Sequence, residues 1–504
     1  MKGYILGLLA NYLGLALSIA IQIFLMPFLL HAMGQELTGL YYLFMTIANF
    51  VAVGVAWMTG AGVYLLASAH SRTDAADPAE VHWVVFLGYT AYAGVVMLVI
   101  WGWGVSAGHW WLTSADPTLV VQGRNACFFL GAYIWINYIH QADIALFTAL
   151  LAQGWANFYR VVSQAVFVGM VFGIVIAAPR LDLLMAANLV GALVAGGWAR
   201  IHLRRSGRLG PWQWRRPKWD LVRQMFYQKG RDYFIFGLAQ FGLIYGDVMI
   251  IGAVLGPAKV SAYLIIWKIP EVMALILGRI SEILSPYLTR LSARSGQGGV
   301  APLFLCTSRL QHGLAAAAGA AYAFFGPDMA GLWVGEAFRP ETPWYYWIAG
   351  MLLFFQVVNR HDIVLHAALA RLGRLVAVQF AELFLKVVLT LLLFDRFGVA
   401  APLVAGLAVQ AAAVTWIYRV SALQESRTGK AAWMREVGGW WLLTAGLMIP
   451  LSWSCRKATP GAEMPEVLLA LLVYGMLAAA VLLLIEWQRK TTGIFHLHAK
   501  LSEV

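Results

Sequence analysis

SAYLIIWKIPEVMALILGRISEILSP, residues 261–286, is the stretch that decides the fold class of this chain. It is mostly apolar and exceeds the roughly 20 residues that an α-helix needs to cross a bilayer. It nevertheless carries Lys268, Glu271, Arg279 and Glu282. At about 100° per residue, all four charges fall within an arc of roughly 80° on one helical face. Because a charge near the bilayer centre costs about 2.5–3.5 kcal/mol, this face must point away from lipid.

Two interpretations of this charged face remain open. The face can line a water-filled cavity inside a helix bundle, where Arg279, Lys268, Glu271 and Glu282 meet a polar substrate. Alternatively, Lys268 with Glu271 and Arg279 with Glu282 form a purely structural ladder of ion pairs, since each pair has the i,i+3 spacing. Both interpretations predict a helix that is surrounded by other helices.

The composition supports a polytopic membrane protein. The chain has 504 residues, of which 61% are hydrophobic and 12% charged, and its mean hydropathy is +0.71. Soluble domains carry roughly 25% charged residues. The net charge of +12 does not suggest a nucleic-acid partner, because the basic residues concentrate beside the predicted spans. The three cysteines have neither metal-ligand spacing nor a disulfide framework, so we expect no metal and no cofactor.

Hydropathy and length predict an all-α protein with about 14 transmembrane helices and no separate soluble domain. Lys and Arg concentrate on the connections of one side, which places both termini in the cytoplasm. The first apolar segment is too long for a signal-peptide core, and we interpret it as a retained span. The predicted spans are 5–30, 40–68, 83–106, 126–150, 157–178, 183–201, 234–255, 261–287, 308–333, 344–368, 375–395, 400–421, 437–454 and 467–486.

The largest predicted cytoplasmic connection, residues 200–231, is basic and rich in tryptophan. Val222 and Phe226 follow Trp219 at i+3 and i+7, which predicts a short amphipathic helix on the inner leaflet. Such a helix favours anionic lipid headgroups. The alternative is that the basic residues serve only to fix the topology.

This connection separates two halves that carry the same markers. Gly34 precedes Tyr41 in the first half as Gly256 precedes Tyr263 in the second, and a further glycine precedes a later span in each half. Two markers at nearly equal offsets predict a parallel repeat of two six-helix lobes, a pattern typical of transporters. The predicted parts are an N-terminal lobe (1–203), a linker with the amphipathic helix (204–231), a C-terminal lobe (232–422) and two additional helices with a cytoplasmic tail (423–504).

Three stretches resemble a known family: PFLLHAMGQELTGLYYL from residue 27, GDVMIIGAVLGPAKVSAYLIIWKI from residue 246, and FFGPDMAGLWVGEAF from residue 324. With the span pattern, they are similar to the polysaccharide-transport (Wzx-like flippase) branch of the multidrug/oligosaccharidyl-lipid/polysaccharide exporter superfamily. The resemblance covers nearly the whole chain but includes no catalytic signature.

The resemblance implies a transporter rather than an enzyme. The expected activity is to flip an undecaprenyl-pyrophosphate-type lipid-linked glycan from the cytoplasmic to the periplasmic leaflet of the bacterial inner membrane. Two lobes would alternate between inward-open and outward-open states. The product would enter surface polysaccharide biosynthesis, either lipopolysaccharide or exopolysaccharide. Expected partners are membrane lipids, a polysaccharide polymerase and other assembly proteins.

The candidate substrate residues are basic and uncharged polar side chains within spans. Arg279 and Arg360 fall in the inner half of the second lobe, and Lys268 lies toward the periplasmic side. Arginine suits a pyrophosphate because its planar fork donates two hydrogen bonds at once. Asn11 and Gln22 share a face of the first span with a serine between them. This face is equally consistent with sugar hydroxyls and with interhelical hydrogen bonds.

Four further residues are candidates for ion coupling. Asp362 and His366 share a helical face, and a buried His–Asp pair can exchange protons near neutral pH. The alternative is a polar contact between helices. Asp143 in the first lobe and Asp247 in the second are isolated acids within spans. Asp247 is expected either to pair with Lys268 or to bind a cation.

Two competing functions remain open. One is an ion-coupled multidrug exporter of the same fold, which the charged stripe disfavours modestly because such drugs are cationic. The other is a membrane polysaccharide polymerase or ligase. Such an enzyme would need a substantial outer loop with catalytic residues, and the longest outer connection, 107–124, holds few charged residues. No GxxxxGK[ST] phosphate loop is present, which argues against ATP hydrolysis by that route.

Overall fold

Helices make up nearly all of the part of the chain that the computed structural model describes. The described residues are 2–51, 58, 62–63, 65–66, 69, 77–106, 117–150, 152–208, 219–223, 231–295, 297–340, 342–369, 371, 373–457 and 464–488. Contacts group the chain into two compact units, Met1–Ser261 and Ala262–Val504.

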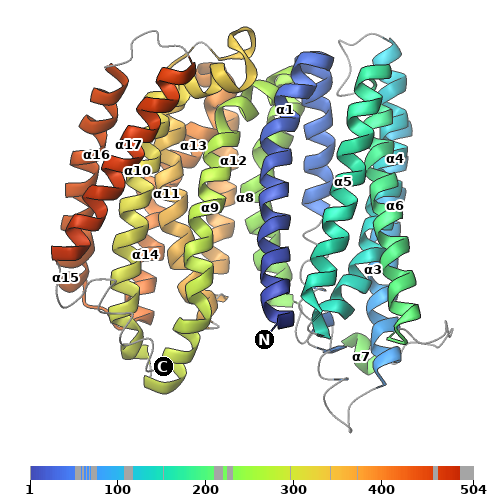
Figure 1. The fold of residues 1–504 in the computed structure, drawn as a ribbon, viewed down its shortest axis with the longest axis horizontal. Coiled ribbons are helices and arrows are strands. Elements are labelled where there is room, and N and C mark those ends of the chain that lie inside the picture. The colour runs from blue at the N-terminus through green and yellow to red at the C-terminus, as the bar shows by residue number, and fades with distance from the viewer. Residues whose placement is uncertain are drawn as a thin grey trace. The chain divides into compact units, whose positions relative to one another are not determined.

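The first unit is built from long apolar helices (Figure 1). Its elements are α1 (Lys2–Val51), α3 (Pro78–Ser106), α4 (Pro117–Ala149), α5 (Gln153–Ala177), α6 (Leu181–Arg205), the short α7 (Trp219–Arg223) and α8 (Arg231–Leu255). Helix α8 packs on α1, so the contacts place it in the first unit. The sequence repeat with a boundary at 231/232 stays a prediction.

Helix α1 is broken at Gly34, whose φ of 76° and ψ of 177° lie outside the helical region. Glycine accepts this conformation because it has no Cβ. The predicted spans beginning at residues 5 and 40 therefore correspond to the two parts of α1, before and after the break at Gly34. Just beyond the break, a Cβ on Gly39 would lie 1.9 Å from the carbonyl oxygen of Pro257. The hydroxyl of Ser261 donates to the carbonyl of Gln35 at 2.7 Å, which fixes the same crossing.

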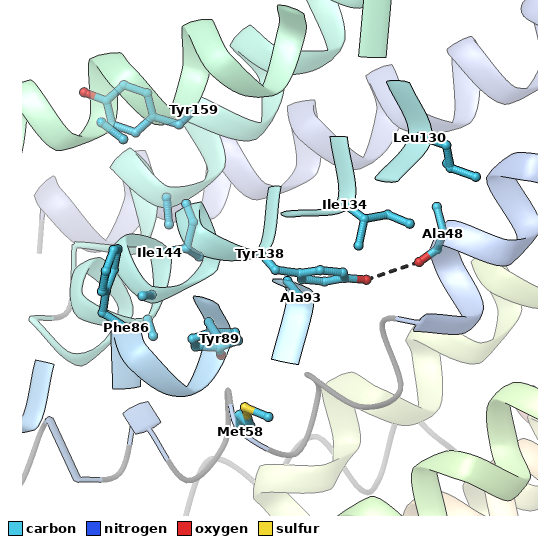
Figure 2. Packing of buried hydrophobic residues seen from close by; sticks show 14 of the residues in the cluster. Ala48, Met58, Phe86, Tyr89, Ala93, Leu130, Ile134, Tyr138, Ile144 and Tyr159 are labelled. Carbon is cyan, nitrogen blue, oxygen red and sulfur yellow. Dashed lines mark hydrogen bonds between the residues drawn. The ribbon is translucent and has the colours of Figure 1, made fainter. Parts of the chain in front are cut away.

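The core of the first unit lies among α1, α3, α4 and α6. Figure 2 shows Tyr138 of α4 reaching across this core, where its hydroxyl donates to the carbonyl of Ala48 at 3.2 Å. Tyr89 of α3 and Ile134 of α4 are buried beside it. Burying large aromatic rings stabilises the core, and the hydrogen bond satisfies the one polar group that Tyr138 brings into it.

Helix α7 is the described part of the predicted amphipathic helix. It has 5 residues, and the residues 224–230 that follow, Phe226 included, lie outside the described part. Trp219, predicted to begin the apolar face, is 69% exposed, whereas Leu221 is buried against the core of the first unit with Val222 beside it. Leu221 and Val222 therefore pack on the protein while Trp219 stays exposed, and the amphipathic helix on the inner leaflet stays a prediction.

The second unit begins within α9 (Pro257–Ser295) and contains ten further helical elements and three short 3-10 turns among its described residues. These are η2 (Gln297–Val300), α10 (Ala301–Val334), η3 (Glu336–Phe338), α11 (Trp344–Ala368), α12 (Gly373–Phe397), η4 (Gly398–Ala400), α13 (Ala401–Val409), the π-helical η5 (Gln410–Val414), α14 (Thr415–Glu425), α15 (Lys430–Trp433), the π-helical η6 (Met434–Gly438), α16 (Gly439–Lys457) and α17 (Met464–Gln488).

Helix α10 is the centre of this unit and contacts α11, α16 and α17 (Figure 1). Gly319 of α10 and Gly350 of α11 face each other so closely that a Cβ on either would lie within 2.6 Å of the other's carbonyl oxygen. On another side of α10, the hydroxyl of Tyr474 in α17 donates to the carbonyl of Ala317 at 2.8 Å. The Arg456 guanidinium of α16 contacts both carboxylate oxygens of Asp328, at 2.6 and 2.9 Å. The additional helices α16 and α17 are thus packed onto the unit.

The described helices include 10 that are long and apolar enough to span a membrane. The chain is therefore a multi-pass membrane protein, but the predicted count of about 14 spans is not confirmed. Predicted spans 375–395 and 400–421 fall in one continuous candidate, Leu375–Glu425. Predicted spans 308–333 and 437–454 lie in α10 and α16, which are helical but are not among the candidates.

Candidate functional site

The second unit brings together two arginines and one glutamate from the predicted substrate face. Glu282 of α9 accepts from Arg279 Nη1 through Oε2 and from Arg360 Nη2 of α11 through Oε1, both at 2.6 Å. The side chains of Arg279, Arg360 and Glu282 are 48%, 43% and 31% exposed. This cluster, the Arg–Glu–Arg bridge, carries a formal net positive charge and lies partly open at the surface of its unit.

Sequence reasoning found the Arg279–Glu282 pair and named Arg360, but it did not join them. The signal was indirect, because only the contact between α9 and α11 brings Arg360 to Glu282. Gly278 takes part in this contact: a Cβ at that position would lie 3.5 Å from Cγ of Arg360. This is an ordinary van der Waals distance, so the stem of Arg360 packs directly beside α9 at Gly278.

The other predicted pair on α9 also forms. Lys268 Nζ donates to Glu271 Oε2 at 3.0 Å, and the two side chains are 11% and 37% exposed. Lys268 is therefore largely buried, whereas the guanidinium of Arg279 is accessible. The ion-pair ladder expected from the i,i+3 spacing is present, but only its Arg279 end is open to an additional anion.

A buried polar layer lies on the other side of α11. His361 Nδ1 is 3.0 Å from the Ser281 hydroxyl of α9, and its Nε2 is 3.2 Å from the Thr307 hydroxyl of α10. The imidazole is also stacked on Phe304, with centroids 5.5 Å apart. His361 thus connects three helices, a role that the sequence did not suggest.

Asp362 lies in a second buried contact, with a partner that sequence reasoning missed. Its carboxylate is 3.1 Å from Nη2 of Arg419 on α14, and the two side chains are 0% and 4% exposed. The same Arg419 nitrogen is 3.2 Å from Nε2 of His312 on α10, and the guanidinium lies over the Trp433 ring at 4.8 Å. A lone arginine in the predicted span 400–421 was the available signal, because a buried charge needs a partner.

His366 was expected to pair with Asp362, and the contact between them has a different geometry. His366 Nδ1 is 2.9 Å from the backbone carbonyl of Asp362, not from its carboxylate. Its Nε2 is 2.8 Å from the Ser421 hydroxyl on α14. The Asp362 carboxylate faces Arg419 instead, so the two predicted coupling residues are neighbours along α11 whose side chains have separate partners.

In the first unit, Asp143 of α4 meets His82 of α3, with 3.5 Å between Oδ1 and Nε2. Both side chains are buried. His140 lies one helical turn before Asp143 and is also buried, and neither of its ring nitrogens has a hydrogen-bond partner among the described residues. Sequence reasoning placed Asp143 beside His140 but missed His82, because the α3–α4 crossing cannot be deduced from spacing along the chain.

The predicted polar stripe on α1 is only partly described. The side chain of Asn11 lies outside the described part, and Gln22 is half-buried. Between them, the Ser18 hydroxyl exchanges hydrogen bonds with the Gln164 amide of α5 at 2.8 and 3.1 Å. At Ser18 the stripe therefore makes an interhelical contact. Asp247 of α8 is buried within the first unit.

Among the residues that the structure describes, no group of three or more His, Cys, Asp or Glu side chains could hold a metal ion.

The comparisons with known proteins identify the fold. No family model and no curated protein sequence matches the chain. The solved structure of the lipid II flippase MurJ, in an inward closed conformation, matches with a TM-score of 0.75 and 9% identity, over 96% of this chain and 99% of that one. An inward-facing multidrug resistance MATE transporter of the MOP superfamily matches with a TM-score of 0.64 and 11% identity, over 82% of this chain and 95% of that one. Its outward-facing counterpart matches with a TM-score of 0.60 and 10% identity, over 85% and 96%.

These matches show that the chain has the fold of the lipid II flippase MurJ and of MATE transporters of the MOP superfamily. The particular structural neighbours are a flippase and drug exporters. Identities this low establish the fold alone, so the substrate has to be argued from this chain's own residues.

Proposed function

We propose that the protein flips a polyprenyl-pyrophosphate-linked oligosaccharide from the cytoplasmic to the periplasmic leaflet by alternating access. The observation that carries this proposal is the Arg–Glu–Arg bridge, in which two half-exposed guanidiniums from two predicted spans converge on one carboxylate. A pyrophosphate is the lipid-linked group that most needs such donors. Arginine matches phosphate oxygens in geometry as well as in charge.

The remaining candidates supply the rest of the path. Lys268 and Glu271 continue the polar face of α9 beyond the bridge. Asn11 and Gln22 on α1 are proposed to meet sugar hydroxyls. Uncharged amides suit a neutral glycan, because they can both donate to and accept from its hydroxyls.

Coupling to an ion gradient is proposed at the buried acids. Asp362 and His366 are embedded among α10, α11 and α14, and Asp143 faces His82 within the first unit. Asp247 is a further candidate. A proton or cation that binds one conformation better than the other would shift the equilibrium between them.

The second candidate function is an ion-coupled multidrug exporter, which the likeness to MATE structures favours. The Arg–Glu–Arg bridge argues against it, because a net positive cluster repels a cationic drug. A polysaccharide polymerase or ligase is less favoured, since the structural neighbours are transporters. The proposed setting is the bacterial inner membrane with both termini cytoplasmic, beside a polysaccharide polymerase and other assembly proteins.

The test is complementation of a strain that lacks surface glycan because its flippase is deleted. Arg279→Ala and Arg360→Ala are each expected to abolish surface glycan while leaving the protein in the membrane at normal levels. Arg279→Lys should keep part of the activity, because it retains the charge but loses the fork. Immunoblotting of membranes and glycan staining measure the two properties separately.

Arg435→Ala is the matched control, since Arg435 is 79% exposed and 3.5 Å from its glutamate partner. It should leave surface glycan unchanged. The proposal fails if Arg279→Ala and Arg360→Ala both support wild-type glycan. If Arg279 matters only through its ion pair with Glu282, replacing both residues by glutamine should restore what Arg279→Ala loses.

A further inference from the structure

Glu282 is the element of the bridge that substrate binding alone does not explain. Each of its two carboxylate oxygens accepts from a different arginine, at 2.6 Å in both cases. The two arginines come from different helices, α9 and α11. The carboxylate therefore occupies the position between two guanidiniums that a phosphate group with two adjacent oxygens would otherwise take.

The arginines are not saturated by this contact. Each guanidinium reaches Glu282 through a single nitrogen, Nη1 of Arg279 and Nη2 of Arg360, although a guanidinium has five N–H donors. Their side chains are 48% and 43% exposed. An incoming anion can thus approach both arginines while Glu282 is still bound.

The buried ion pairs of the same unit do not have this property. Arg419 and Asp362 are 4% and 0% exposed, and Arg419 is also held by His312 and Trp433. Lys268 is 11% exposed and contacts Glu271 alone among the described ion pairs. The combination of two cations, one shared carboxylate and an accessible surface distinguishes the Glu282 cluster from these contacts.

We propose that the Glu282 carboxylate competes with the pyrophosphate headgroup for Arg279 and Arg360. When no substrate is bound, this carboxylate occupies the position between the two arginines. This inference rests on the proposed function and adds a step to it. A pyrophosphate displaces the carboxylate on binding, and the carboxylate displaces the pyrophosphate on release. No bond is made or broken, and the two arginines are never left facing each other without an anion.

The consequence is a site that binds its anion weakly enough to let it go. Two free arginines would hold a pyrophosphate through several charge-assisted hydrogen bonds, each about twice as strong as a neutral one. A transporter must release its substrate on the other side, so tight binding in either state slows turnover. A tethered carboxylate lowers the affinity without weakening the geometry that selects a phosphate.

The first experiment measures the affinity of inorganic pyrophosphate for the purified full-length protein in detergent by isothermal titration calorimetry. Glu282→Gln should tighten binding by about tenfold, because the amide is a weak competitor for a guanidinium. The pyrophosphate affinity of Glu282→Asp should lie between those of the wild type and Glu282→Gln, since the shorter side chain cannot reach both arginines equally. Adding Arg279→Gln to Glu282→Gln should remove the gain.

The matched control is Glu336→Gln. Glu336 also pairs with an arginine at i,i+3, 2.9 Å from Arg339, but it contacts a single arginine. It should leave pyrophosphate affinity unchanged. If Glu336→Gln tightens binding as much as Glu282→Gln, the effect comes from net charge and the proposal is overturned. The proposal is equally overturned if Glu282→Gln weakens binding or leaves it unchanged in a folded protein.

The second experiment separates this inference from the proposed function. In the complementation strain, Glu282→Gln should reduce surface glycan although its pyrophosphate affinity has risen, because release becomes slow. Tighter binding with full glycan production would overturn the release step. If Arg279→Ala leaves glycan intact while Glu282→Gln still tightens pyrophosphate binding, the lipid-linked substrate is wrong and the exchange of carboxylate for phosphate stands.

Discussion

At the scale of single residues, the ion pairs of the second unit divide by exposure. Asp362 and Arg419 are buried away from solvent, where the attraction between charges must offset the loss of their hydration. Arg279, Glu282 and Arg360 are half-exposed, so solvent screens their attraction and a competing anion can exchange with it. The first pair is suited to hold helices together, and the second cluster is suited to bind and release.

The first prediction at this scale concerns Arg419→Leu. Removing the guanidinium leaves the Asp362 carboxylate buried without its charged partner, which should destabilise the protein by about 3–5 kcal/mol. Thermal unfolding in detergent, followed by intrinsic fluorescence, measures the loss. The double change Arg419→Leu with Asp362→Leu should recover much of it, because no unpaired charge then remains. Arg435→Leu, on an exposed side chain, is the control. A stable single variant would show that Arg419 is not needed to neutralise Asp362.

The sequence could predict which residues belong to the polar face but not all of their partners. Arg279 and Glu282 lie on one helix, so their contact follows from the 3.6-residue period. The Arg360, Arg419 and His82 contacts each join helices that are separate in sequence. Such contacts depend on crossing angles and helix rotation, which one sequence without packing information does not determine.

At the scale of helices, close approach depends on residues without side chains. Gly319 and Gly350 allow the backbones of α10 and α11 to meet, and this crossing brings Thr307 near His361. In lipid, association of helices relies on such packing rather than on the hydrophobic effect. The same α10 carries α16 and α17 on another side. The position of α11, and with it Arg360, therefore depends on a contact that involves no charged residue.

The element-scale prediction is that Gly350→Ala separates α10 from α11. The new methyl group would lie 2.4 Å from the Gly319 carbonyl oxygen, so the backbones must move apart. We expect a loss of stability of about 1–3 kcal/mol, as for other overpacked sites. Thermal unfolding in detergent gives the stability, and surface glycan reports whether Arg360 is displaced.

Gly446→Ala on α16 is the control for this change, because a Cβ there meets nothing within 4 Å. It should be neutral or slightly stabilising, since alanine favours helix more than glycine does. If Gly350→Ala proves as stable as Gly446→Ala, the α10–α11 crossing is more adaptable than the structure indicates.

Hydropathy predicted most helices at this scale because each one is a long apolar run. The boundaries between the helices were harder to predict from hydropathy. Gly34, with a φ of 76°, breaks α1, although the hydrogen-bonding pattern runs through it. Gly398, with a φ of 50°, lies between α12 and α13, which hydropathy joins in one candidate span. The π-helical segments at Gln410–Val414 and Met434–Gly438 had no recognisable signal in the sequence. A π turn depends on how neighbouring helices fit, which hydropathy does not measure.

At the scale of the whole molecule, the charge pattern predicts a single orientation in the membrane. The end of α6 carries His202, Arg204 and Arg205 in its last turn, and its first turn carries Asp182. Basic residues are retained on the cytoplasmic side during insertion. The two ends of this one helix therefore provide a direct test of the orientation.

The prediction is that a cysteine replacing Arg204 is inaccessible to an impermeant maleimide in intact cells, whereas a cysteine replacing Arg180 is labelled. Arg180 and Arg204 are both exposed and lie at opposite ends of α6. A difference in labelling therefore reports the side of the membrane and not the burial of the residue. The background must lack Cys127, Cys306 and Cys455. Permeabilised cells should label both positions. Labelling of the Arg204 position from outside would reverse the orientation and with it the proposed direction of transport.

The Asp362–Arg419 contact also bears on how the protein is made. Asp362 lies on α11, and Arg419 lies on α14, beyond α12 and α13. A ribosome therefore delivers the acidic helix to the translocon well before the helix that neutralises it has been synthesised. During that interval the Asp362 carboxylate of α11 lacks its Arg419 partner. The Asp362–Arg419 pair can thus form only after α14 has been inserted, which makes the packing of α11 against α14 a late step in the assembly of the second unit.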